Sequence, residues 1–133
     1  MNLNILLVED DEIETLKLER AFKKLGYTHN IFNVKNGEEA LSFCKLEQPN
    51  LILLDLNMPK MNGLEFLFLL KGDKDLKFIP TVIFTTSNNH QDLVKAYEIG
   101  VAGYIVKPLR YENYVTQIEK LIEYWSINEL VTK

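Results

Sequence analysis

The chain alternates between short strand-like runs and longer amphipathic stretches, and this alternation constrains its fold more than any other feature. Five short runs, rich in aliphatic residues, predict strands at residues 3–8, 29–34, 51–56, 81–86 and 102–106. After each run comes a stretch with apolar residues at helical spacing, at residues 11–26, 36–47, 62–72, 90–100 and 111–125. The predicted fold class is therefore α/β: a doubly wound, flavodoxin-like sheet of five parallel strands in the order 2-1-3-4-5, with helices on both faces.

Length and charge exclude several classes of protein. The 133 residues suit one domain, and a net charge of −4 without a basic stretch argues against nucleic-acid binding. No apolar run approaches the length of a membrane span, and the first residues lack the pattern of a signal peptide. The single cysteine, Cys44, cannot form an internal disulfide and is expected to pack inside a helix. We therefore expect a cytoplasmic protein that binds neither nucleic acid nor a membrane.

Polar side chains stand where four of the predicted strands end. Glu9 and Asp10 follow the first strand, Asp55 lies at the end of the third, Thr85 ends the fourth and Lys107 follows the fifth. Because ligands of such sheets bind beyond the carboxyl ends of the strands, these groups are expected to share one crevice. Three carboxylates in one place repel one another and stay ionised only beside a cation. Hard oxygen ligands on short side chains favour Mg²⁺.

The acidic stretch after the first strand and the two histidines also have interpretations without a functional role. The sequence "EDDE" at residues 9–12 is also typical of a solvated acidic turn before a helix, and Asp11 is interpreted as the start of that helix. His29 and His90 are interpreted as surface residues.

Four motifs carry a resemblance to a known family. They are "LLVEDD", "LILLDLNMPKMNG", "VIFTTS" and "YIVKP", in this order along the chain. With these motifs the chain resembles the receiver domain of bacterial two-component response regulators, which has the CheY-like fold, over nearly its whole length. The resemblance implies a stand-alone response regulator that takes a phosphoryl group from a sensor histidine kinase and signals through a conformational switch.

The resemblance assigns a role to each acidic residue of the crevice. It implies that Asp55 accepts the phosphoryl group in a Mg²⁺-dependent reaction. The implied metal site comprises Glu9, Asp10, Asp55 and the backbone carbonyl of Asn57, with Glu9 and Asp10 as the acid pair.

The resemblance also implies the parts of a switch. Thr85 is similar to the switch hydroxyl of the family, Tyr104 to its switch aromatic and Lys107 to its lysine. The bond between Lys107 and Pro108 is expected to be cis and to aim the ammonium group at Asp55. In the turn after the third strand, Pro59 is expected to stiffen the chain and Gly63 to let it close.

The expected partners are proteins. We expect a receiver domain over residues 1–126 and a short tail over 127–133 without an output domain, so the output would be a contact with a downstream protein that the sequence does not identify. The sequence "TTS" and the pair Tyr124 and Trp125 are similar to receivers that work with bacterial phytochrome kinases. The aromatic pair could instead complete the core or serve a homodimer.

Apolar residues on two predicted helices leave further alternatives. Ile13 and Leu16 lie beside the acid cluster, where a kinase would dock, although scattered apolar residues are common on surfaces. The third helix is apolar nearly all round at residues 66–70, which indicates either deep burial or a partner face.

Two other functions compete with the phosphorylated receiver. One is a pseudo-receiver, a scaffold of the same fold that works without phosphorylation. The other is a metal-dependent phosphohydrolase with an aspartyl intermediate, against which stands Asn57 where such an enzyme needs a second acid. We expect a signalling protein rather than a dedicated enzyme, with slow self-dephosphorylation as its only turnover.

Overall fold

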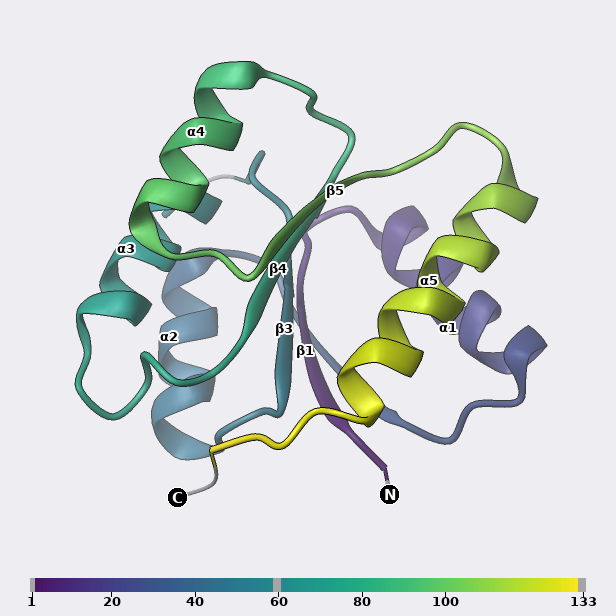
Figure 1. Cartoon of the computed structure of the whole chain (residues 1–133), viewed down its shortest axis with the longest axis horizontal. Coiled ribbons are helices and arrows are strands. Elements are labelled where there is room, and N and C mark those ends of the chain that lie inside the picture. The colour runs from purple at the N-terminus through teal and green to yellow at the C-terminus, as the bar shows by residue number, and fades with distance from the viewer. Residues whose placement is uncertain (1, 59–60, 132–133) are drawn as a thin grey trace.

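The computed structural model describes residues 2–58 and 61–131, which form one parallel sheet between two layers of helices (Figure 1). The strands are β1 (Asn4–Val8), β2 (Asn30–Val34), β3 (Leu51–Leu54), β4 (Thr81–Thr85) and β5 (Gly103–Val106). The helices are α1 (Glu12–Leu25), α2 (Gly37–Leu46), α3 (Gly63–Gly72), α4 (His90–Ile99) and α5 (Tyr111–Ser126). Strands and helices alternate along the whole chain, as the sequence pattern predicts.

The strand order is β2-β1-β3-β4-β5, and every neighbouring pair is parallel. The predicted topology is therefore confirmed. Helices α1 and α5 cover one face of the sheet, while α2, α3 and α4 cover the other (Figure 1). Because the strand order reverses between β1 and β3, a crevice is expected beyond the carboxyl ends of these two strands.

The central strands are buried on both faces. In β1, Ile5 and Leu7 pack with α1 and α5, while Leu6 and Val8 pack with α2 and α3 on the other side. Successive side chains of a strand point to opposite faces, so a strand between two helical layers must be apolar at every position. This explains the unbroken apolar runs at residues 5–8 of β1 and 51–54 of β3.

The helices begin where their sequences supply caps. Asp11 accepts a hydrogen bond from the Ile13 N–H at 2.9 Å, so its interpretation as the start of α1 is confirmed. Asn62 and Glu65 form a reciprocal capping box at the start of α3. The buried Cys44 lies inside α2, as expected.

The segment between α3 and β4 contributes two core residues that the sequence patterns did not assign. Leu76 and Ile79 are buried in the core beneath α3. The Lys71 ammonium donates hydrogen bonds to the carbonyl groups of Lys77 and Ile79, at 2.9 and 3.0 Å. One charged side chain thus supplies donors to two carbonyl groups of an irregular segment, which helps to fix its path.

His29 lies at the surface, as interpreted, but it is partly buried and holds a backbone group. Its Nδ1 accepts a hydrogen bond from the Leu3 N–H at 2.8 Å, and its ring packs edge to face with Tyr27 and Phe22. Partial burial lowers the pKa of this imidazole, because the charged form loses hydration. His90 is exposed as expected, at the first position of α4.

Within residues 2–58 and 61–131, no helix is long and apolar enough to cross a membrane.

Candidate functional site

The ends of β1 and β3 bring three acidic side chains together. The two strands pair with Val8 opposite Leu54, and the Asp55 N–H donates to the Val8 carbonyl at 3.0 Å. Glu9 and Asp10 follow β1 directly, just as Asp55 follows β3. One carboxylate oxygen from each of Glu9, Asp10 and Asp55 lies within 4.8 Å of the others. The structure thus brings together the acids that the sequence placed at strand ends.

A hollow of about 470 Å³ lies over this cluster. It is lined by Glu9, Asp10, Asp11, Glu14, Asp55, Asn57, Thr86 and Lys107. The sequence patterns did not single out Glu14. A usable signal was its position, four residues after Asp10 and within the first turn of α1, which directs the side chain back toward the strand end.

Two of the three acids are withdrawn from solvent. Asp55 is 8% exposed and Glu9 is 3% exposed, whereas Asp10 is exposed. Burial raises the pKa of Asp55 and of Glu9, because both carboxylates lose hydration, although the Lys107 charge opposes the shift. A cation at this place would therefore favour the ionised form of both groups.

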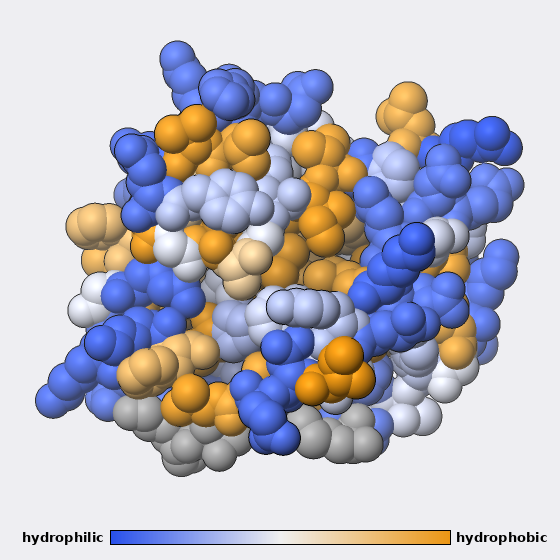
Figure 2. Space-filling view, in the orientation of Figure 1, coloured by the Kyte–Doolittle hydropathy of each residue, from blue (hydrophilic) through white to orange (hydrophobic). Residues whose placement is uncertain are grey.

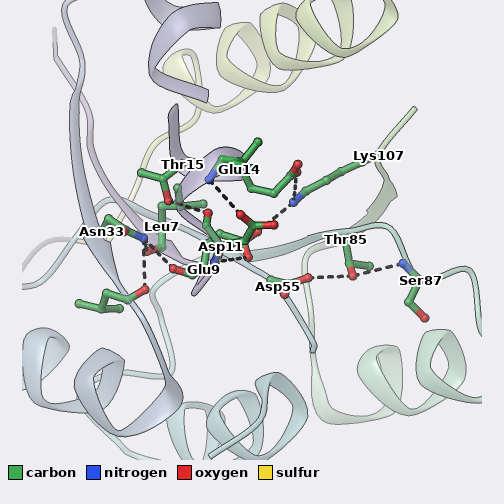
Figure 3. Close-up of polar contacts among 12 residues, drawn as sticks. Leu7, Glu9, Asp11, Glu14, Thr15, Asn33, Asp55, Thr85, Ser87 and Lys107 are labelled. Carbon is green, nitrogen blue, oxygen red and sulfur yellow. Dashed lines mark hydrogen bonds and ion pairs between the residues drawn. The ribbon is translucent and has the colours of Figure 1, made fainter. Parts of the chain in front are cut away.

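Thr85 contacts the Asp55 side chain directly. The hydroxyl donates a hydrogen bond of 2.9 Å to Asp55 Oδ1, and both side chains are buried (Figure 3). The Ser87 N–H donates to the same hydroxyl at 3.3 Å, and the Ser87 carbonyl accepts a hydrogen bond of 3.0 Å from the Tyr104 hydroxyl. A chain of hydrogen bonds therefore joins Asp55 to Tyr104 through the segment after β4.

Lys107 reaches the acid cluster from the end of β5. Its Nζ lies 3.0 Å from Glu9 Oε1 and 2.8 Å from Glu14 Oε1, and only 6% of its side chain is exposed (Figure 3). Burial alone would lower the pKa of this ammonium, but the hydrogen bonds and charges of Glu14 and Glu9 outweigh it, so the pKa is raised. Lys107 therefore carries a positive charge into the crevice.

The predicted cis bond between Lys107 and Pro108 is wrong. No peptide bond among the described residues, which include both of these, is cis. The Lys107 N–H continues the sheet by donating to the Thr85 carbonyl at 2.7 Å, and the ammonium reaches the acids from this trans backbone. Since trans is the lower-energy isomer by about 0.5–1 kcal/mol, the observed placement of the lysine does not require cis.

The turn after β3 is held close to the site by the absence of a side chain at Gly63. A Cβ atom at this position would lie 2.5 Å from the Asp55 carbonyl oxygen and 2.9 Å from the Leu56 Cα. The expectation that Gly63 lets the turn close is confirmed, and close approach rather than an unusual dihedral angle is the reason. Pro59 lies outside the described residues.

The acid cluster fits a hard divalent cation. Its carboxylate oxygens are the ligand type that Mg²⁺ takes, with water completing the shell. Both Glu9 oxygens already accept hydrogen bonds, one from Lys107 and one from the Asp11 N–H at 3.3 Å. Asp10 and Asp55 are thus better placed than Glu9 to contact a metal directly. Asn57 lines the same hollow, and the role of its carbonyl stays a prediction.

The apolar residues predicted as partner contacts do reach the surface. Ile13 is 73% exposed and Leu16 is 56% exposed. In α3, Phe66 is buried whereas Phe68 is 65% exposed, so each of the two interpretations of this helix applies to part of it. Figure 2 shows further apolar side chains over α4 and beside β5, and Val94 of α4 and Val106 of β5 are 43% and 40% exposed.

The fold and this site together define the class of protein to which the chain belongs. Five parallel strands in this order, with acids after β1 and β3, a hydroxyl at the end of β4 and a lysine after β5, are the arrangement of two-component receiver domains. Residues 5–119 match the family model for the response regulator receiver domain, and the chain belongs to this family.

Relatives from archaea and bacteria agree with this assignment. The chain is 39% identical to the probable methanogenesis regulatory protein FilR2 of Methanothrix harundinacea, over 91% of this chain and 82% of the relative. It is 34% identical to response regulator Rcp1 of Synechocystis sp., over 91% and 87% of the two chains. The crystal structure of Rcp1 in its Mn²⁺-bound form superposes with a TM-score of 0.89, at 32% identity and with 98% and 99% coverage.

The structure also resembles a receiver in its phosphorylated form. The phosphorylated cyanobacterial phytochrome response regulator RcpA superposes with a TM-score of 0.92, at 31% identity and with 99% and 100% coverage. The protein is therefore a receiver-domain signalling protein of two-component systems, and its family is not one of dedicated enzymes.

Proposed function

We propose that this protein is a phosphorylation-switched response regulator whose phosphoacceptor is Asp55. The observation that carries the proposal is the position of this carboxylate. It lies within 4.8 Å of two further acids, accepts a hydrogen bond from Thr85 and shares its crevice with the ammonium of Lys107. A phosphoryl group on Asp55 would have donors on one side and a cation site on the other.

In the proposed reaction, an Asp55 carboxylate oxygen attacks the phosphorus atom of a phosphohistidine on a sensor histidine kinase. The phosphorus–nitrogen bond breaks, its electron pair returns to the imidazole, and a phosphorus–oxygen bond to Asp55 forms. A bound Mg²⁺ would neutralise charge on the phosphoryl oxygens. Later attack by water would release phosphate and restore the Asp55 carboxylate.

The residues of this chain have separate tasks in the reaction. Asp10 and Asp55 would hold the metal with the carbonyl of Asn57, and Glu9 would orient Lys107 through their ion pair. Lys107 and Thr85 would donate hydrogen bonds to phosphoryl oxygens. Because little covalent chemistry is asked of the protein, positioning and charge neutralisation account for most of the rate.

The same hydrogen-bond chain offers a route for the signal. A phosphoryl group adds about −1.5 to −2 charges and strong acceptor oxygens. Thr85 would turn its hydroxyl from Asp55 to a phosphoryl oxygen, and Ser87, which donates to that hydroxyl, would move with it. Tyr104 bonds to the Ser87 carbonyl and would change position in turn. These movements would change the shape of the protein surface around β4, α4 and β5.

The proposed upstream partner is a sensor histidine kinase of the phytochrome kind. The support is the similarity to RcpA, described as a phytochrome response regulator. The kinase would contact Ile13 and Leu16, which are exposed on the first turns of α1 beside the hollow. The output would be a contact with a second protein or a second copy, for which the apolar surface over α4 and β5 is available (Figure 2).

The proposal is tested with a small phosphoryl donor. Acetyl phosphate and Mg²⁺ should raise the intact mass of the wild type by one phosphoryl group. Asp55→Asn, which keeps the size and the acceptor oxygen of the side chain, should gain none. Equal labelling of the two proteins would reject Asp55 as the acceptor, and no labelling of the wild type would favour the pseudo-receiver.

A further inference from the structure

Glu14 takes part in the ion pair that holds Lys107, although none of the predicted site roles includes it. Lys107 Nζ lies 2.8 Å from Glu14 Oε1, slightly closer than its 3.0 Å to Glu9 Oε1. The Glu14 side chain is 22% exposed and the Lys107 side chain 6% exposed, so water competes little for the contact. The lysine follows β5 and the glutamate lies in the first turn of α1, so the pair ties two distant elements together.

The ion pair directs the ammonium toward α1 and β1. Figure 3 shows the Lys107 amine beside the carboxylates of Glu14 and Glu9, while Asp55 faces Thr85. In the part of the chain that the structure describes, Lys107 makes no hydrogen bond or ion pair with Asp55, although its charge lowers the pKa of that carboxyl. An ammonium has three N–H donors, and two of them are directed at Glu9 and Glu14.

A phosphoryl group on Asp55 would therefore compete with Glu14 for Lys107. Glu9 is itself a member of the acid cluster with Asp55, so its contact with the lysine is compatible with a small movement toward Asp55. Glu14 lies one helical turn farther along the chain, and its contact is the one that such a movement would lengthen. Charge-assisted hydrogen bonds of this kind are shorter and stronger than neutral ones, so breaking this contact has a measurable free-energy cost.

The geometry points to Glu14 as a positioning residue that holds the Lys107 ammonium toward α1 while Asp55 is unmodified and yields it to an aspartyl phosphate. This inference rests on the proposed function of Asp55. Glu14 thereby lowers the affinity of the site for a phosphoryl group in the resting protein, and it adds a movement of α1 relative to β5 when the site is filled. Glu14 does not touch the reacting atoms.

The first measurement uses the metal-free protein. The side-chain ammonium of Lys107 is observed by NMR after ¹⁵N-lysine labelling and is assigned with Lys107→Met. Glu14→Gln should shift this signal and speed its hydrogen exchange with water, whereas Glu14→Asp should do so less. Glu12→Gln, which removes the same charge from an exposed position on the same helix, should leave the signal in place.

The second measurement uses beryllofluoride, a phosphoryl mimic, with Mg²⁺ and fluorine NMR. Glu14→Gln should bind it about three- to tenfold more tightly than the wild type, because the lysine no longer has to leave a charged partner. Glu14→Asp should restore most of the wild-type affinity, and Glu12→Gln should change it little.

The outcomes separate this inference from the function on which it rests. An unmoved Lys107 signal in Glu14→Gln, or beryllofluoride affinity in that variant equal to or below the wild type, overturns the role of Glu14 alone. Failure of the wild type to bind beryllofluoride at all overturns the phosphoryl site and the competition together. If Glu14→Gln is poorly folded, Glu14→Ala, which also removes the charge, takes its place, and an unmoved signal or an unchanged beryllofluoride affinity in that variant overturns the role of Glu14.

Discussion

The Thr85 hydroxyl donates a hydrogen bond of 2.9 Å to Asp55 Oδ1 across the ends of two neighbouring strands, and both residues are buried. A buried carboxylate needs such donors, because each one replaces part of the hydration that it has lost. The bond lowers the pKa of Asp55, against the larger effect of burial, which raises it. Thr85 therefore prepares Asp55 to be ionised, the state in which it can act as a nucleophile.

Thr85→Val should remove this donor while keeping the shape of the side chain. We expect the pKa of Asp55 to rise further in carboxyl ¹³C NMR titrations. The free energy of unfolding at neutral pH should fall by about 1–2 kcal/mol, because an ionised group is left with one donor fewer. Thr28→Val, at an exposed position outside the hollow, should leave the Asp55 titration unchanged. An unchanged pKa of Asp55 in Thr85→Val would show that the hydrogen bond from Thr85 does not stabilise the ionised carboxylate.

The pH dependence of the free energy of unfolding should reveal the cost of burying ionised carboxylates in the acid cluster. Burial raises the pKa of Asp55 above its usual value of 3.8, so the folded state disfavours the ionised form. The contribution of this group to stability is complete below that usual value and is lost as pH rises through the raised pKa. Asp55→Asn does not titrate, so in metal-free buffer its advantage over the wild type should be absent at acid pH and grow toward neutrality.

At neutral pH that advantage should be on the order of 1–3 kcal/mol, because burial deprives the ionised carboxylate of hydration and the charge of Asp10 adds to this cost. Urea unfolding followed by circular dichroism measures it. Glu19→Gln, at an exposed position on α1, serves as the control and should show no such growth. Saturating Mg²⁺ should stabilise the wild type but not Asp55→Asn. A constant difference at all pH values would contradict the proposed origin in burial and repulsion.

The turn beside the site should tolerate no side chain at Gly63. In Gly63→Ala, the new Cβ would meet the Asp55 carbonyl at 2.5 Å, so this turn or β3 must shift. We expect a loss of about 1–3 kcal/mol in the free energy of unfolding and weaker Mg²⁺ binding by calorimetry. Gly72→Ala is the matched control, because nothing lies within 4 Å of its added Cβ at the end of the same helix. It should be neutral or stabilising by up to about 1 kcal/mol.

The first turns of α1 should affect phosphorylation only when the phosphoryl donor is a protein. Ile13→Ser with Leu16→Ser should reduce the rate of phosphotransfer from a phosphorylated histidine-kinase domain about tenfold or more, since exposed apolar residues at the centre of a contact can each supply more than 1 kcal/mol. The rate with acetyl phosphate should stay the same. Phe68→Ser, at an equally exposed apolar position on α3, is the control. Equal losses with both donors would indicate damage to the site instead of a lost contact.

The sequence predicted the fold and most of the site because both depend on strong local patterns. Strands buried on two faces are apolar throughout, so β1 and β3 stood out, and the acids that end them are then fixed at one edge of the sheet. Glu14 escaped notice because its partner, Lys107, is 93 positions away and helical periodicity treats an isolated glutamate as solvent-facing. The hydrogen bond of His29 escaped prediction for the same reason, since its partner Leu3 belongs to another segment.

Two other differences come from backbone geometry. The trans bond before Pro108 could not be foreseen, because an X–Pro bond differs little in energy between its two forms and the surroundings decide. The core residues Leu76 and Ile79 lie in an irregular segment without a helical or strand period, and the ammonium of Lys71 helps to order it. Such contacts appear only once the chain is folded.

The position of the phosphoryl group on the chain can be determined chemically. The wild type is treated with acetyl phosphate and Mg²⁺, and borohydride then reduces any acyl phosphate before peptide mass spectrometry. The proposal predicts that residue 55 alone carries the reduced side chain and that Asp10→Asn, which lacks one metal ligand, carries almost none. Reduction at Glu9, Asp10 or another carboxylate in the wild type, with residue 55 unmodified, would contradict Asp55 as the phosphoacceptor.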